Sequence, residues 1–136
     1  MKILIVGHGE YGTGIKSTMK LLTGIDENID ALNLNNELTH EKYKSILHEY
    51  VENNDELIIF ADLTGGAPFQ IASQEVLLNR SNGNQYVIGG VSVGCILDIV
   101  MNTMVLDNEK DIKDIIKNAI DEIRDMASII SKDELE

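Results

Sequence analysis

Short apolar runs alternate with longer amphipathic stretches along the whole chain. Four of these runs predict buried β-strands, at residues 2–6, 29–34, 56–61 and 86–88. Apolar residues recur at helical spacing in five further stretches, at residues 13–22, 40–52, 69–79, 95–104 and 109–130. Strands that alternate with helices indicate a mainly parallel sheet covered by helices on both faces. Because such crossovers are right-handed, the pattern predicts a doubly wound α/β fold of four strands.

The chain has 136 residues, of which 43% are hydrophobic, and it shows neither a break in composition nor an internal repeat. A single domain over residues 1–136 is therefore expected. The apolar runs are far shorter than the roughly 18 residues of a membrane span, and the first residues are too few for a signal-peptide core. A lone Cys95 excludes an internal disulfide and a cysteine-based zinc site. Together these features favour the cytoplasm.

The formal net charge of −12 argues against nucleic acid as a partner, since 23 acidic residues would repel the phosphate backbone. A small anionic ligand is still compatible with this charge, because backbone amides can bind an anion inside an acidic protein.

Three predicted strands end in loops of unusual composition, at residues 7–12, 62–68 and 89–94. In a parallel sheet these loops lie at the same edge, where ligands bind in open α/β folds. The sequence therefore predicts that His8, Asp62 and Ser92 converge.

His8 lies between Gly7 and Gly9, at the end of a strand and just before a helix. The flanking glycines leave the imidazole accessible, and the helix that follows offers free N–H groups to a phosphoryl group. A neutral imidazole is also a nucleophile near neutral pH. A ring that only fills a turn is the alternative, and the position of His8 favours the nucleophile.

Asp62 has two compatible interpretations, a turn or cap residue and a partner that orients the His8 ring. Gly65 and Gly66 indicate a tight turn whose N–H groups are also candidate donors to phosphoryl oxygens. A loop serine such as Ser92 usually bonds its own backbone. His40, His48 and Cys95 are interpreted as surface or packing residues without a site.

Residues 7–12 also match the Gly-x-Gly-x-x-Gly pattern of dinucleotide-binding folds, with Asp30 near the place of a ribose-binding acid. The chain is short for such an enzyme, and Asp30 falls at the start or middle of its strand rather than at the end. A small nucleotide-binding enzyme is therefore a weaker alternative.

Three segments together resemble the mannose-family enzyme IIA domain of the phosphoenolpyruvate-dependent sugar phosphotransferase system: residues 5–9, residues 62–69 and residues 87–93. The resemblance covers roughly residues 1–130. It implies that the phosphocarrier protein HPr phosphorylates His8, that Asp62 partners the ring, and that the group passes to an enzyme IIB protein. Membrane subunits IIC and IID would then import the sugar. No metal or organic cofactor is implied, and the predicted phosphoryl-binding residues are Gly9, Thr64, Gly65, Gly66 and Ser92.

The resemblance further implies a homodimer in which a C-terminal segment, after about residue 125, is exchanged as a fifth strand.

Two departures from the family pattern touch the rim of the site. Ala67 stands where Ser or Thr is common, and residues 92–95 replace an Asn-x-Pro-Met segment. A regulatory module that binds a partner according to the phosphorylation of His8 is an alternative, and the sequence does not identify the sugar.

Overall fold

The computed structural model describes residues 1–106 and 110–135. It contains the strands β1 (Lys2–His8), β2 (Ile29–Leu34), β3 (Leu57–Ala61) and β4 (Gln85–Gly89). The α-helices are α1 (Tyr11–Thr23), α2 (His40–Asn53), α3 (Ala67–Leu78), α4 (Val93–Val100) and α5 (Ile112–Ile123). The chain divides into two compact units, Met1–Val91 and Ser92–Glu136, and the sheet belongs entirely to the first.

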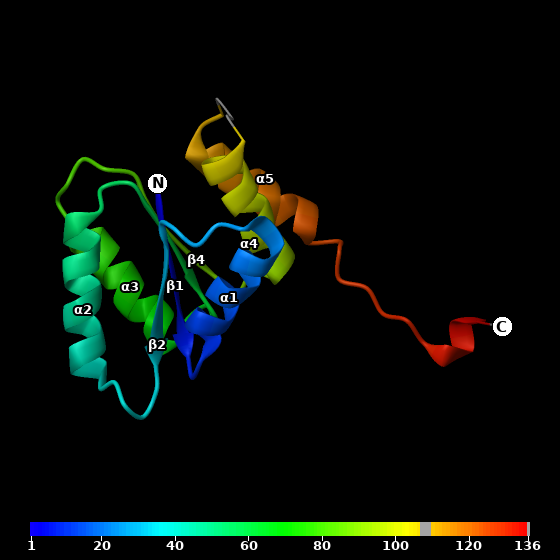
Figure 1. Ribbon diagram of the computed structural model, residues 1–136, viewed down its shortest axis with the longest axis horizontal. Helices are drawn as coiled ribbons and strands as arrows, with labels where there is room; N and C mark the ends of the chain where they lie inside the picture. Colours follow the sequence, from blue (N-terminus) through cyan, green and yellow to red (C-terminus); the bar gives the residue numbers. More distant parts are fainter. Residues whose placement is uncertain (107–109, 136) are drawn as a thin grey trace. The chain divides into compact units, whose positions relative to one another are not determined.

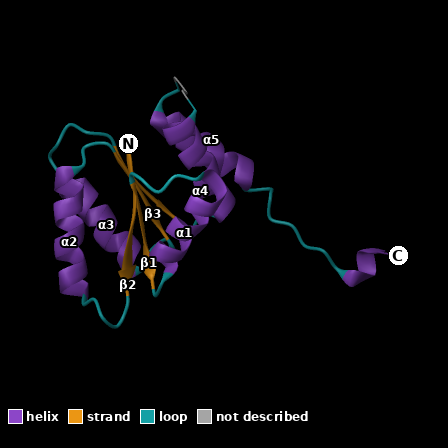
Figure 2. Cartoon of the chain, viewed as in Figure 1, coloured by secondary structure: helices purple, strands orange, loops and turns teal. Residues whose placement is uncertain are grey.

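The four strands, which are orange in Figure 2, form one parallel sheet. Their order in the sheet is β2-β1-β3-β4. Strand β1 therefore lies between β2 and β3, where Val6 is in register with Leu32 on one side and Ala61 on the other. Every residue of β3 is buried, as are residues 3–7 of β1. Uninterrupted apolar runs of this kind are typical of strands that are covered on both faces. The predicted α/β fold with four parallel strands is confirmed.

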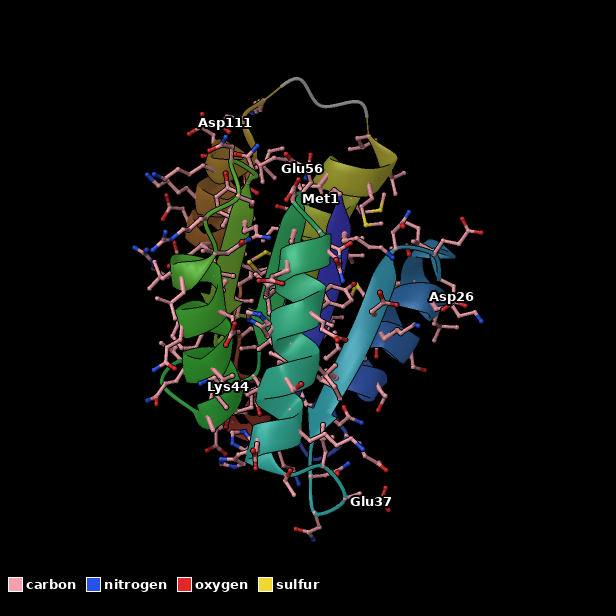
Figure 3. The ribbon with its side chains drawn as sticks, turned by 90° about the vertical axis from the view of Figure 1, so that its left-hand side faces the viewer. Met1, Asp26, Glu37, Lys44, Glu56 and Asp111 are labelled. Carbon is pink, nitrogen blue, oxygen red and sulfur yellow. The ribbon has the colours of Figure 1, made fainter. Side chains whose placement is uncertain are left out.

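Helices of the first unit cover both faces of the sheet. Helices α2 and α3 lie side by side on one face (Figures 1 and 3), where they enclose a core with Leu4, Val6 and Ile59 of the strands. Because side chains alternate along a strand, Ile3 and Ile5 point to the opposite face, which α1 covers. The two layers fix the positions of the strand ends, and through them the loops that carry the candidate site.

The predicted ends of two helices are confirmed. Helix α1 ends at Gly24, whose N–H donates to Lys20 O over 2.8 Å. Helix α2 begins after Thr39, whose hydroxyl accepts a hydrogen bond from the N–H of Lys42 over 3.2 Å.

The second unit departs from the sequence prediction at two places. Helix α4 continues into a π-helix, Met101–Val105, whose i→i+5 pattern is shown by a 2.9 Å bond from Leu106 N–H to Met101 O. Helix α5 was expected over residues 109–130 but ends at Ile123, so its predicted C-terminal part is wrong. The expected start, Glu109, lies outside the described residues.

After α5 the structure records a short 3-10 helix, Lys132–Leu135, and no strand among the described residues beyond β4. The exchange of a fifth strand in a dimer therefore stays a prediction, as does the single domain over the whole chain. None of the helices in the described part of the chain is long and apolar enough to cross a membrane.

Candidate active site

His8 and Asp62 lie together at the carboxyl edge of the sheet. His8 is the last residue of β1 and Asp62 follows β3, and these neighbouring strands pair Val6 with Ala61 just before their ends. The His8 ring atom Nδ1 is 2.8 Å from Asp62 Oδ2, and the backbone N–H of His8 donates to the same oxygen over 2.9 Å. The N–H of Leu63 donates to Asp62 Oδ1 over 2.9 Å. Both carboxylate oxygens are thus engaged, and the predicted proximity of the pair is observed.

The charge state of Asp62 determines which nitrogen of His8 is free. Burial alone would raise the pKa of Asp62, but the hydrogen bonds from the His8 N–H, the His8 ring and the Leu63 N–H outweigh it, so the pKa lies below its ordinary 3.8. The carboxylate is therefore ionised at neutral pH and can only accept hydrogen bonds. The proton of the His8–Asp62 bond must then reside on Nδ1, which leaves the lone pair on Nε2. With 47% of its side chain exposed, His8 is accessible, whereas the Asp62 side chain is only 12% exposed.

The glycines on either side of His8 serve the local fold. A Cβ on Gly7 would come within 2.6 Å of the Tyr11 ring, so the ring packs directly on the backbone there. Gly9 adopts φ +59°, which turns the chain from β1 into α1, and its N–H donates to Leu34 O over 2.9 Å. Because this N–H already has an acceptor in the sheet, the predicted contact of Gly9 with a phosphoryl group finds no support in the observed bonding.

The loop after Asp62 brings the beginning of α3 next to the His8 ring. Residues 63–66 form a tight turn in which the Gly66 N–H donates to Leu63 O over 3.2 Å and Gly65 has φ +85°. Gly66 is the N-cap of α3, and no side chain caps it. A Cβ on Gly66 would be 3.1 Å from His8 Cε1. The first turn of α3, with N–H groups that have no acceptor inside the helix, therefore starts beside the exposed ring.

The two predicted hydroxyl groups have other neighbours. The Thr64 hydroxyl packs against the end of β4, where a Cβ on Gly89 or Gly90 would be 2.7 or 3.1 Å from Oγ1. Ser92 belongs to the second unit and caps α4, accepting a hydrogen bond from the N–H of Cys95 over 3.2 Å. Phosphoryl binding by Thr64 and Ser92 stays a prediction. Cys95 is fully buried at the start of this helix, which confirms its interpretation as a packing residue.

A second histidine–carboxylate pair was not predicted. His48 is exposed, as expected, but its Nδ1 is 2.7 Å from Oε2 of Glu75, and its Nε2 is 3.2 Å from Oε1 of Glu52. Glu75 is only 6% exposed. The sequence does carry a signal for its burial, because Glu75 continues the buried i, i+4, i+7 stripe of Pro68 and Ala72 along α3.

A nucleotide-binding enzyme would need a ribose-binding acid at the carboxyl end of its second strand, and Asp30 does not lie there. Asp30 is the second residue of β2, far from the carboxyl end, and it accepts a 2.6 Å hydrogen bond from the hydroxyl of Tyr50. Its carboxylate also lies 3.5 Å from Lys2 Nζ. These contacts make Asp30 part of the fold rather than a ribose ligand. Among the residues described, no group of three or more His, Cys, Asp or Glu side chains is arranged to hold a metal ion.

Known proteins share this fold. The chain is similar to phosphotransferase system component EIIA from Streptococcus agalactiae, with a TM-score of 0.78 and 22% identity over 98% of both chains. It is also similar to the mannose/sorbose specific IIA subunit from Enterococcus faecalis, with a TM-score of 0.74 and 14% identity over 96% of this chain and 94% of the other. A PTS IIA protein associated with the fucose utilization operon of Streptococcus pneumoniae has a TM-score of 0.72 and 20% identity, covering 99% and 96% of the two chains.

At these identities the solved structures establish the fold alone, and no curated protein matches the sequence. The family itself is shown by the sequence. Residues 2–124 match the family EIIA-man, described as the PTS system fructose IIA component. The chain therefore belongs to the mannose-type enzyme IIA family of the sugar phosphotransferase system.

Proposed function

We propose that this protein relays a phosphoryl group in sugar uptake, with His8 as the residue that carries it. HPr would donate the group to His8, and an enzyme IIB protein would receive it and pass it on to sugar imported through IIC and IID. The observation that carries the proposal is the half-exposed His8 ring, whose Nδ1 is held 2.8 Å from the ionised carboxylate of Asp62 while Nε2 is left to react.

In the proposed step, the lone pair of His8 Nε2 attacks the phosphorus of phosphorylated HPr. One P–N bond forms at Nε2 as the P–N bond of HPr breaks, and the departing electron pair stays on the HPr histidine. The proton on Nδ1 does not move, so the phosphorylated ring has imidazolium character. Asp62 stabilises that positive charge through the hydrogen bond that is already in place. The same arrangement run in reverse delivers the group to enzyme IIB.

The start of α3 supports the binding of the phosphoryl oxygens. Its first-turn N–H groups and its helix dipole favour a negative charge next to the His8 ring, and Gly66 leaves the space that a side chain would fill. Positioning and electrostatics account for most of the catalysis of phosphoryl transfer. The Gly66 N–H already donates to Leu63 O. We therefore assign the donors to the N–H of Gly65 and to the free N–H groups in the first turn of α3.

Incubation with phosphoenolpyruvate, enzyme I and HPr tests the proposal. We expect one acid-labile, base-stable phosphate per chain in the native protein and none in His8→Ala. His40→Ala and His48→Ala are the matched controls, since both remove an exposed imidazole elsewhere and should leave labelling intact. Labelling that persists in His8→Ala would refute the assignment, whatever the two controls show.

A further inference from the structure

Gln70 lies in the first turn of α3, and its side chain reaches back to the turn beside the His8 ring. Its Nε2 donates a hydrogen bond to Gly65 O over 2.7 Å, although Gln70 is itself exposed. The backbone N–H of Gln70 donates to Gly66 O over 2.9 Å. A Cβ on Gly66 would be 3.1 Å from His8 Cε1. One residue thus holds two successive carbonyl groups of the turn that adjoins the reacting ring.

The bond from the Gln70 side chain affects which N–H groups at the start of α3 are free. In a regular α-helix, the N–H of Phe69 would donate to the carbonyl four residues earlier, which is that of Gly65. The side chain of Gln70 engages this carbonyl instead. In the described part of the chain, the N–H groups of Ala67 and Phe69 have no acceptor, and Pro68 has no N–H. Two donors therefore remain free in the first turn of the helix.

Helix α3 itself is held in place without the Gln70 side chain. The hydroxyl of Tyr43, which is fully buried on α2, donates to Pro68 O over 3.3 Å. Ala72 lies in the core between α3 and the sheet, and Ile71 packs against it. Because these contacts fix the helix, the Gln70 side chain acts on the turn before it.

Building on the proposed function, we propose that Gln70 is a positioning residue for phosphoryl transfer. Its side chain occupies Gly65 O, so the N–H of Phe69 stays free. This N–H then donates to a phosphoryl oxygen on His8. Without the side-chain bond, α3 gains one hydrogen bond at its start, from Phe69 N–H to Gly65 O, and the phosphoryl group loses a donor. Donors contribute most when they need no rearrangement during the reaction.

The test replaces Gln70 with methionine, which has a similar shape but no N–H donor. With phosphorylated HPr as the substrate, we expect Gln70→Met to lower the maximal rate of His8 phosphorylation about tenfold and to leave the KM for HPr within about twofold. Gln70→Glu should lower the rate further, since its carboxylate only accepts hydrogen bonds and repels a phosphoryl group. Gln74→Met is the matched control, because it changes an exposed glutamine one turn further along α3 and should leave both constants unchanged.

Amide NMR provides a readout at the proposed donor itself. Phosphorylation of His8 in the native protein should shift the Phe69 amide proton downfield. We expect Gln70→Met to abolish this shift and Gln74→Met to keep it. A native maximal rate in Gln70→Met would overturn the positioning role, and so would a Phe69 shift that persists in this variant.

The positioning role can also be tested if the proposed function fails. If HPr does not phosphorylate the native protein, the relay is refuted, and inorganic phosphate then serves as the probe. Its titration into the native protein should still shift the Phe69 amide, and Gln70→Met should abolish that shift. If phosphate leaves this amide unshifted in the native protein, the role of Gln70 is refuted as well.

Discussion

At the scale of single residues, the chain presents a natural comparison between two histidines. His8 and His48 each have Nδ1 within 2.7–2.8 Å of a largely buried carboxylate, and their side chains are 47% and 53% exposed. The difference lies at the other nitrogen. Nε2 of His48 is 3.2 Å from Glu52, a negative group that repels a phosphoryl donor, whereas the His8 ring adjoins Gly66 at the start of a helix. The surroundings of Nε2, more than the carboxylate partner, therefore favour His8 as the phosphoryl acceptor.

Asp62→Asn tests how far the carboxylate contributes to transfer. The amide has nearly the same shape but no negative charge, so it neither enforces the Nδ1–H tautomer nor stabilises an imidazolium ring. We expect phosphorylation of His8 by HPr to slow by on the order of 10²-fold, measured by rapid quench. Asp30→Asn is the control, since Asp30 bonds Tyr50 within the fold. A native rate in Asp62→Asn would show that the pair only shapes the loop.

The sequence predicted that the two partners of this pair converge, and it gave their contact as one of two compatible interpretations of Asp62. Both residues follow buried apolar runs, which places them at the carboxyl edge of any parallel sheet. Whether they touch depends on β1 and β3 being neighbours, and the order β2-β1-β3-β4 is not encoded in the local pattern. Hydrogen bonds such as that from the Gly9 N–H to Leu34 O also depend on tertiary register, so the sequence does not show that this predicted donor already has an acceptor.

At the scale of elements, the strands and most helices could be predicted from the periodicity of apolar residues. The switch from an α-helix to a π-helix could not. The apolar spacing over residues 95–104 is compatible with both an α-helix and the observed switch to a π-helix at Met101–Val105, because the side-chain pattern hardly differs over one turn. Helix α5 was predicted too long, since Met126, Ile129 and Ile130 continue an apolar pattern that the described chain leaves exposed.

The packing of α2 on α3 should depend on pH through His48. The hydrogen bond to Glu75 and the charge of Glu52 raise the pKa of His48. Burial opposes this rise, and the charges of Glu75 and Glu49 add smaller contributions to it. A raised pKa means that the protonated ring stabilises the folded state. This contribution is fully present below the ordinary value of 6.5 and is lost as the pH rises through the higher value in the folded protein.

We therefore expect His48→Ala to lower the Tm more at pH 6 than at pH 9, with thermal unfolding followed by circular dichroism. Glu75→Gln should reduce the same pH dependence, because it removes the charge that the ring faces. His40→Ala, which removes another exposed imidazole from α2, should leave the pH dependence in place. A loss of stability in His48→Ala that is equal at both pH values would contradict the assignment.

At the scale of the whole molecule, the described residues after α5 leave several apolar side chains exposed. Met126, Ile129 and Ile130 are 71%, 82% and 85% exposed, and residues 126–131 form neither helix nor strand. Adjacent apolar side chains that a single chain leaves in water mark an association surface, because covering them releases free energy in proportion to the apolar area. In a protein with a net charge of −12, apolar contacts of this kind must also overcome mutual repulsion between copies.

We predict that the protein is a dimer held together in part by Ile129 and Ile130. The double variant Ile129→Asp/Ile130→Asp places two charges in the apolar contact, so it should shift the molar mass measured by light scattering from that of two chains toward the 15.1 kDa of one. Leu21→Asp/Leu22→Asp is the matched control, since it changes two adjacent exposed leucines of α1 and should leave the mass unchanged. If instead the α1 variant dissociates and the C-terminal variant does not, the interface lies on the first unit. If light scattering gives the native protein the molar mass of one chain, the predicted dimer is refuted. The two isoleucines would then be free to bind a different partner.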